Sequence, residues 1–229
     1  MTKSYQINLF DGHLIIEADG LKVLVDTGSP VTIGNDTSFI FMGQQHQCTK
    51  SILGNGVAEL SELMGYNIDI LMGLDILQQY YILINYQGKE ITFSTEELPL
   101  DSEFSTPIIR GGMGEVCINI SVKGEIAKVA LDTGAKISYI DPSYVRGEQA
   151  TETRDDFHPS IGAFRTPIYC MDASISGQEF PVQFGTLPKL MAMSLSLIGI
   201  YGAIGFDLFN AFTVLLDFKN NKLHCKKVI

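Results

Sequence analysis

Two copies of the tripeptide Asp-Thr-Gly are the residues of this sequence best suited to chemistry. Asp26-Thr27-Gly28 and Asp132-Thr133-Gly134 each follow a run of apolar residues, and the two aspartates are 106 positions apart. A carboxylate at the end of an apolar strand needs local support, and the glycine permits a tight turn whose backbone N–H points back at it. If two such loops meet, their carboxyls share one proton, so that one is a general base and the other a general acid. Such a pair can hydrolyse an amide without a metal or a covalent intermediate.

The elements around the two tripeptides are repeated as well. Residues 22–29 are echoed at 128–135, and residues 71–77 at 203–209, where Gly73 and Gly205 hold the same place. The offset is 106 residues for the first echo and 132 for the second, so the middle of the second half is 26 residues longer. An internal repeat predicts two units of one architecture that together build one core.

The stretch 96–107 separates the two repeats. It holds two prolines and four acidic residues with little periodicity, which is typical of a linker. We therefore expect one unit at residues 1–101 and a second at residues 102–229.

Short apolar runs with turn residues between them predict an all-β fold. The expected strands are 14–17, 21–25, 81–85, 117–122, 126–131 and 213–218, and hairpin turns are expected at 19–20, 87–88, 123–124 and 220–221. One short helix is expected in each half, at 75–79 and 207–211, capped by Asp75 and Asp207. Gly73 and Gly205 are expected to be packing positions beside the Asp-Thr-Gly loops.

Composition and charge exclude several classes of function. The chain has 16 Lys and Arg against 26 Asp and Glu, a net charge of −10, so nucleic acid is not expected as a partner. The four cysteines form no CxxC pair and the four histidines no HExxH pattern, so we expect buried, reduced thiols, no metal and no cofactor. The start of the chain lacks an apolar leader, which favours a cytoplasmic location. The uncharged run 190–206 is expected to be a buried segment and not a membrane span.

Taken together, the two Asp-Thr-Gly motifs and their downstream Gly-x-Asp partners resemble the aspartic protease superfamily of pepsins and retropepsins. The chain is similar to a short, single-chain tandem of two retropepsin-like units. The resemblance implies two β-barrel lobes related by a pseudo-twofold axis, with the active site between them and a peptide or protein as substrate. It implies a monomer whose catalytic residues are Asp26 and Asp132. The supporting loop residues would be Thr27, Gly28, Ser29, Thr133, Gly134 and Ala135, with the two threonines interlocking the loops.

This superfamily also covers its substrate with a glycine-tipped β-hairpin, the flap. In the first half the candidate residues are Gly54, Asn55 and Gly56, within the segment 51–57. In the second half they are Gly162 and Ala163, within the segment 160–164. One flap, as in pepsins, and two flaps, as in retropepsins, both fit the sequence. The polar stretch 147–160 is expected to be an exposed loop with solvated charges.

One difference between the two loops leads to a further expectation. Ser29 follows the first tripeptide, whereas Ala135 follows the second. A serine hydroxyl there is expected to hydrogen-bond Asp26 and favour its charged form, so that Asp26 ionises more readily than Asp132. The sequence leaves open a second function, a catalytically inactive peptide-binding protein with the same fold.

Overall fold

Strands dominate the chain in the computed structural model, which describes residues 1–228 except 53, 113, 159 and 160. The predicted all-β class is confirmed. We call residues 1–101 the first half and residues 102–229 the second half; this division stays a prediction. The first half contains β1 (Thr2–Phe10), β2 (His13–Ala18), β3 (Leu21–Val25), β4 (Ile33–Gly34), β5 (Ser38–Phe41), β6 (Gln44–Gln47), α1 (Val57–Met64), β7 (Ile70–Met72), α2 (Leu74–Leu77), β8 (Tyr81–Asn85) and β9 (Glu90–Ser94).

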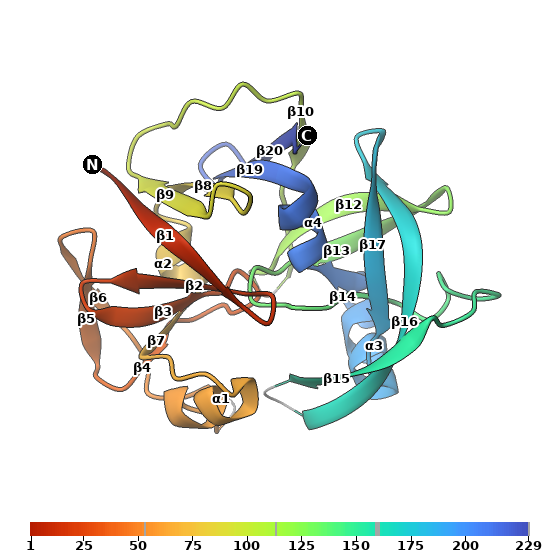
Figure 1. The fold of residues 1–229 in the computed structure, drawn as a ribbon, viewed down its shortest axis with the longest axis horizontal. Helices are drawn as coiled ribbons and strands as arrows, with labels where there is room; N and C mark the ends of the chain where they lie inside the picture. The colour runs from red at the N-terminus through yellow and green to blue at the C-terminus, as the bar shows by residue number, and fades with distance from the viewer. Residues whose placement is uncertain (53, 113, 159–160, 229) are drawn as a thin grey trace.

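The second half follows a similar order with additional strands. It contains β10 (Phe104–Pro107), β11 (Ile109–Arg110), β12 (Val116–Val122), β13 (Glu125–Leu131), β14 (Ser138–Ile140), β15 (Glu152–His158), β16 (Gly162–Ile175), β17 (Gln178–Thr186), α3 (Lys189–Leu197), β18 (Gly202–Ile204), α4 (Phe206–Ala211), β19 (Phe212–Asp217) and β20 (Lys222–Lys227). Figure 1 shows the first half in red to yellow and the second in green to blue, side by side.

A ten-stranded sheet joins the two halves. Its strand order is β10-β20-β19-β8-β9-β1-β2-β3-β7-β4, so β8 of the first half lies directly beside β19 of the second. The pairing is antiparallel, with Ile84 opposite Val214 and Leu83 opposite Leu215. An eight-stranded sheet in the order β11-β12-β13-β18-β14-β17-β16-β15 belongs to the second half alone, and β5 and β6 form a separate hairpin.

The same crossing of strands leads into both Asp-Thr-Gly loops. β3 runs parallel to β7, and β4 pairs antiparallel with the same β7. In the second half β13 runs parallel to β18, and β14 pairs antiparallel with β18. All six strands are apolar and mostly buried, which fixes the two loops to rigid supports.

In the part of the chain that the structure describes, each half has two helices and not the single one predicted. The additional helices are α1 and α3, which precede β7 and β18. The expectation that residues 190–206 form a buried segment is wrong for α3. Leu190 is 78% and Leu197 is 87% exposed, and Ala192 is the buried residue of this helix. The apolar composition of this run suggested burial, but leucines seven positions apart share one helix face whether or not another element covers that face.

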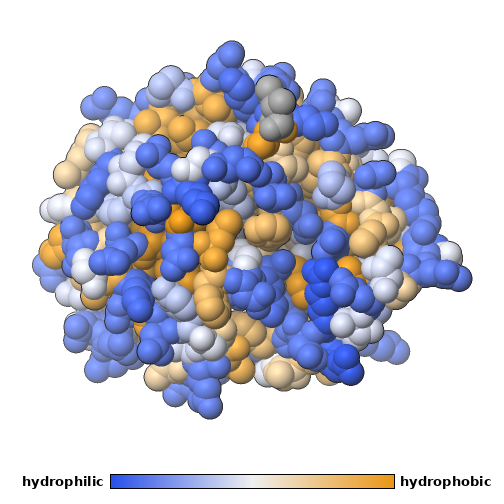
Figure 2. Space-filling model, viewed as in Figure 1, coloured by the Kyte–Doolittle hydropathy of each residue, from blue (hydrophilic) through white to orange (hydrophobic). Residues whose placement is uncertain are grey.

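The surface is mixed in character. Figure 2 shows a mostly hydrophilic face with apolar residues exposed between the polar ones. Across the described part of the chain, no helix is both long enough and apolar enough to cross a membrane. The four cysteines are free thiols, of which Cys117 and Cys225 are buried and Cys170 is exposed.

Candidate active site

Asp26 and Asp132 occupy corresponding places at the ends of β3 and β13. The backbone N–H of Asp26 donates to Met72 O at 3.0 Å, and that of Asp132 donates to Ile204 O at 2.9 Å. Each aspartate is therefore anchored to the central strand of its own half, β7 or β18. The side chains of both are half-buried.

Thr27 and Thr133 lock the two loops together through four hydrogen bonds. The backbone N–H of each threonine donates to the other's hydroxyl at 3.0 Å. The hydroxyl of Thr27 donates to Leu131 O at 2.7 Å, and the hydroxyl of Thr133 donates to Val25 O at 2.7 Å. Because both hydroxyls are buried and fully used, the threonines position the loops and are not free to bind a ligand.

The glycines of the two loops bring the carboxyls together. A Cβ atom added to Gly28 would lie 2.5 Å from Cγ of Asp132, and one added to Gly134 would lie 2.7 Å from Cγ of Asp26. Each carboxyl thus packs on the glycine of the other loop, which brings the two carboxyls next to each other. Any side chain at either glycine would push the pair apart.

The two carboxyls differ in their hydrogen-bond donors. Asp26 Oδ1 accepts from the N–H groups of Gly28 at 2.8 Å and Ser29 at 3.1 Å, and Asp132 Oδ1 accepts from that of Gly134 at 2.9 Å. Burial raises the pKa of both aspartates, and the negative charge of Asp26 raises the pKa of Asp132 further, well above its usual range. The arrangement therefore suits one shared proton, carried by Asp132 while Asp26 is charged.

The expected hydrogen bond from the Ser29 hydroxyl to Asp26 is wrong. That hydroxyl donates to Val31 O at 2.8 Å, and a serine has a single hydroxyl proton to donate. Ser29 supports Asp26 through its backbone N–H instead. Ala135 fills the corresponding position in the second loop. Because the Ser29 hydroxyl donates to Val31 O, the presence of serine in one loop and alanine in the other gives neither carboxyl a hydroxyl donor.

Asp75 and Asp207 are not the helix caps that the sequence predicts. The N-cap residues are Gly73 and Gly205, whose backbones are extended. Asp75 accepts from the Thr32 hydroxyl at 2.6 Å, and Asp207 accepts from the Ser138 hydroxyl at 2.6 Å. Those carboxylates reach back to β4 and β14 because each lies inside the first turn of its helix.

Thr32 and Ser138 are site residues that the sequence interpretation missed. Their hydroxyls accept from the N–H groups of Gly73 at 3.0 Å and Gly205 at 3.2 Å, so each connects a helix start to the loop behind its aspartate. They are also 106 positions apart, which is the offset of the aspartates. That spacing is the signal that could have identified them.

Gly73 and Gly205 are packing positions, as predicted. A Cβ atom on Gly73 would lie 2.4 Å from Val31 O, and one on Gly205 would lie 2.3 Å from Ala135 O. The backbone of each Asp-Thr-Gly loop therefore leaves no room for a side chain there.

The candidate flap of the first half is not an extended hairpin. Gly54 lies in a tight turn closed by a single bridge between Ile52 and Asn55, and Gly56 is the N-cap of α1. A glycine-rich turn suits both the tip of a hairpin and the start of a helix. Composition alone therefore did not distinguish the two. Leu53 of the same segment lies outside the described residues.

The second half does carry a long hairpin, formed by β15 and β16. Gly162 pairs with His158 and Ala163 with Phe157 at its end, while Ser160 of this segment lies outside the described residues. Residues 152–158 are therefore an edge strand and not the exposed loop that was expected. Figure 1 shows β15 reaching from the second half toward α1 of the first. Phe157 packs against the apolar cluster of α1, β2 and β3.

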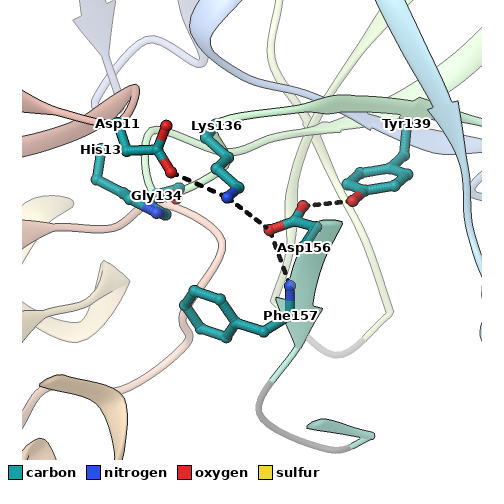
Figure 3. A network of polar contacts seen from close by, with 7 residues as sticks. All are labelled: Asp11, His13, Gly134, Lys136, Tyr139, Asp156 and Phe157. Carbon is teal, nitrogen blue, oxygen red and sulfur yellow. Dashed lines mark hydrogen bonds and ion pairs between the residues drawn. The ribbon is translucent and has the colours of Figure 1, made fainter. Parts of the chain in front are cut away.

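A polar network fixes this hairpin to both halves. Lys136, two residues after Gly134, lies 2.9 Å from Asp11 Oδ2 and 3.8 Å from Asp156 Oδ1. Asp156 accepts from the hydroxyl of Tyr139 and from the backbone N–H of Phe157. Figure 3 shows these residues converging beside the second Asp-Thr-Gly loop. With 8% of its side chain exposed, Asp156 is not the solvated charge that the sequence suggested.

An open cavity of about 1330 Å³ adjoins this network. It begins at Asp11 and Lys136 and runs along β16, β17 and α4, and neither Asp26 nor Asp132 lines it. The cavity therefore continues away from the carboxyl pair and does not contain it. Among the described residues, no group of three or more His, Cys, Asp and Glu is placed to hold a metal ion.

Comparison with known proteins relates this fold to a solved structure. No protein-family model and no curated protein matches the chain. The crystal structure of the aspartic proteinase from Irpex lacteus matches with a TM-score of 0.56 and 11% sequence identity, over 100% of this chain and 98% of that one. The chain therefore shares a pepsin-like fold with that proteinase.

Proposed function

We propose that this protein is an aspartic endopeptidase, which hydrolyses peptide bonds with Asp26 and Asp132. The observation that carries the proposal is the pair of adjacent carboxyls on two interlocked loops, each carboxyl held by backbone N–H of its own loop. The pepsin-like fold supports it, since that fold surrounds the same kind of carboxyl pair in the superfamily that the sequence resembles.

The difference between the carboxyls assigns their roles. Asp26 has two backbone donors and is the charged member, so it removes a proton from a water bound between the carboxyls. Asp132 holds the shared proton and donates it to the oxygen of the scissile carbonyl as the water oxygen attacks the carbon. Asp26 then passes the proton that it took from the water to the amide nitrogen, and the C–N bond breaks. One hydroxyl proton of the diol returns to Asp132, which leaves an acid and an amine and restores the carboxyl pair.

The β15–β16 hairpin is proposed to act as the single flap. It crosses from the second half to the α1 cluster, so a substrate beneath it would lie between the halves. Its edge strand, β15, offers backbone groups to an extended peptide, as in recognition by strand addition. Phe157 and Asp156 would leave their partners when the flap opens. One chain supplies both aspartates, so a monomer without a cofactor suffices.

Cleavage of an unbiased peptide library tests the proposal. The purified chain is expected to cleave peptides internally, while Asp26→Asn and Asp132→Asn each abolish cleavage and still bind a statine-type transition-state mimic. Asp101→Asn is the matched control, because that side chain is fully exposed and its ion-pair partner is Lys226, and this variant is expected to cleave normally. Peptide binding without cleavage by the unaltered chain would support the inactive peptide-binding protein instead.

A further inference from the structure

His13 reaches across the seam between the halves to the second Asp-Thr-Gly loop. It is the first residue of β2, in the first half, and only 5% of it is exposed. Its Nδ1 atom lies 2.5 Å from Gly134 O. A carbonyl oxygen accepts only, so this nitrogen must carry the proton and donate it. The contact therefore fixes the tautomer of His13 and the position of the Gly134 carbonyl.

The carbonyl that His13 contacts belongs to Gly134, and the N–H of the same residue donates to Asp132 Oδ1 at 2.9 Å. A hydrogen bond to this carbonyl restrains the Gly134 backbone, which sets the direction of that N–H. The N–H of Ala135 donates instead to the backbone oxygen of Asp132 at 3.3 Å. His13 is thus connected to Asp132 through the backbone of Gly134.

This connection distinguishes the two otherwise similar loops. Ile16 pairs with Val23 in the first half as Ile118 pairs with Val129 in the second, so the place of His13 corresponds to Glu115. The second half therefore has no histidine at this place. His13 supplies a difference between the loops that the serine hydroxyl does not.

The surroundings of His13 keep it uncharged near neutral pH. Burial lowers the pKa of its imidazole, which outweighs the opposing effects of Gly134 O and of the carboxylates of Asp156 and Asp11, while Lys136 adds to the lowering. When His13 is protonated, its charge lowers the pKa of Asp26. These groups come from the flap strand, the turn before β2 and the two Asp-Thr-Gly loops.

The flap covers His13 in this structure. The ring of Phe157 on β15 lies with its centroid 6.1 Å from that of His13, at an angle of 42°. Figure 3 shows His13 directed at Gly134 with Phe157 below it. A closed flap therefore shields the His13–Gly134 hydrogen bond from water, which strengthens it.

We propose that His13 is a positioning residue of the carboxyl pair: it donates to Gly134 O, holds the second loop in place and so keeps the Gly134 N–H directed at Asp132. The proposal rests on the proposed function for its role in catalysis. Its effect on the Asp132 carboxyl is independent of catalysis and is measured separately.

The test follows the carboxyl carbon of Asp132 by ¹³C NMR during a pH titration, with the pH profile of kcat/KM beside it. His13→Phe keeps a ring but removes the donor, so Asp132 is expected to lose its proton at a pH higher by roughly half a unit. The alkaline limb of the pH profile is expected to move by the same amount in the same direction. His13→Asn places an amide N–H near the Nδ1 position and is expected to restore both.

His46 provides the matched control. It is also a buried histidine, 6% exposed, but its Nε2 atom is 3.2 Å from the Tyr80 hydroxyl and not from either loop. His46→Phe is expected to leave the Asp132 titration and the alkaline limb unchanged. His13→Ala serves as a second donor-free variant if His13→Phe does not fold.

The outcomes separate this inference from the proposed function. An unchanged Asp132 titration in folded His13→Phe or His13→Ala overturns the role of His13, whether or not the chain cleaves peptides. An equal shift in His46→Phe also overturns it, because the effect would then follow from any loss of a buried histidine. If the unaltered chain does not cleave peptides but the titration shifts as expected, the proposed function fails and the link to Asp132 stands.

Discussion

Replacing Thr27 by valine is expected to destabilise the fold strongly, although the volume of the side chain hardly changes. Valine has nearly the same shape but removes the hydroxyl, which donates to Leu131 O and accepts from the N–H of Thr133. Thr27 is 2% exposed and Thr133 1%, so water does not replace the lost partner. Each buried polar group left unpaired costs ~1–3 kcal/mol, so the free energy of unfolding should fall by roughly 2–6 kcal/mol.

Urea unfolding followed by circular dichroism measures this change. Thr27→Ser is the control, since it keeps the hydroxyl and removes one methyl group, worth about 0.8 kcal/mol. Thr133→Val should match Thr27→Val, because it leaves Val25 O and the N–H of Thr27 unpaired in the same way. If Thr27→Val and Thr27→Ser lose equal stability with equal m-values, the interlocking hydrogen bonds do not hold the loops together.

Three further predictions concern the glycine behind the second loop, the ionisation of the pair and the flap. Gly205→Ala is expected to lower the Tm of thermal unfolding strongly, because its Cβ would lie 2.3 Å from Ala135 O. Gly112→Ala is the control and should leave the Tm unchanged, because Gly112 has open space around it. Equal Tm values for the two variants would contradict the close packing. The raised pKa of Asp132 means that the unfolded chain releases this proton first as pH rises, so the carboxyl destabilises the fold increasingly above pH 3.8. At pH 7 the midpoint of urea unfolding should therefore be higher for Asp132→Asn than for the unaltered chain, and below pH 3.8 the two midpoints should be nearly equal. The same difference between the midpoints at both pH values would contradict this. Phe157→Ala should raise KM for peptide cleavage roughly 10-fold, since the closed flap loses about 1.4 kcal/mol of apolar contact, and an unchanged KM would show that Phe157 does not close it.

Much of the carboxyl site was predictable because its signals are local and repeated. An apolar strand followed by Asp-Thr-Gly specifies both the support and the turn of each loop, and the repeat implies that two loops exist to meet. The packing role of Gly73 and Gly205 followed from the same repeat. The partners of Asp75 and Asp207 did not follow from the repeat. An aspartate at the start of a helix is usually predicted to cap it, and the sequence does not show that the hydroxyls of Thr32 and Ser138 lie within reach of these carboxylates.

Strand β15 of the proposed flap escaped the sequence interpretation for a different reason, although Gly162 and Ala163 beside its turn were named as flap candidates. Residues 152–158 are rich in charge, and such composition is typical of a solvated loop. They form an edge strand because β16 supplies the backbone partners, and an edge strand tolerates charged side chains on its open side. Asp156 is buried only through contacts with Lys136 and Tyr139, which lie on other elements. No pattern within β15 itself reports those contacts.

Titration of both carboxyl carbons in the unaltered chain by ¹³C NMR shows whether Asp26 and Asp132 act as one acid–base unit. Two coupled steps are expected, with one proton retained by the pair well above the ordinary aspartate pKa of 3.8 and both carbons responding to each step. Two independent curves, each centred near 3.8, would contradict it.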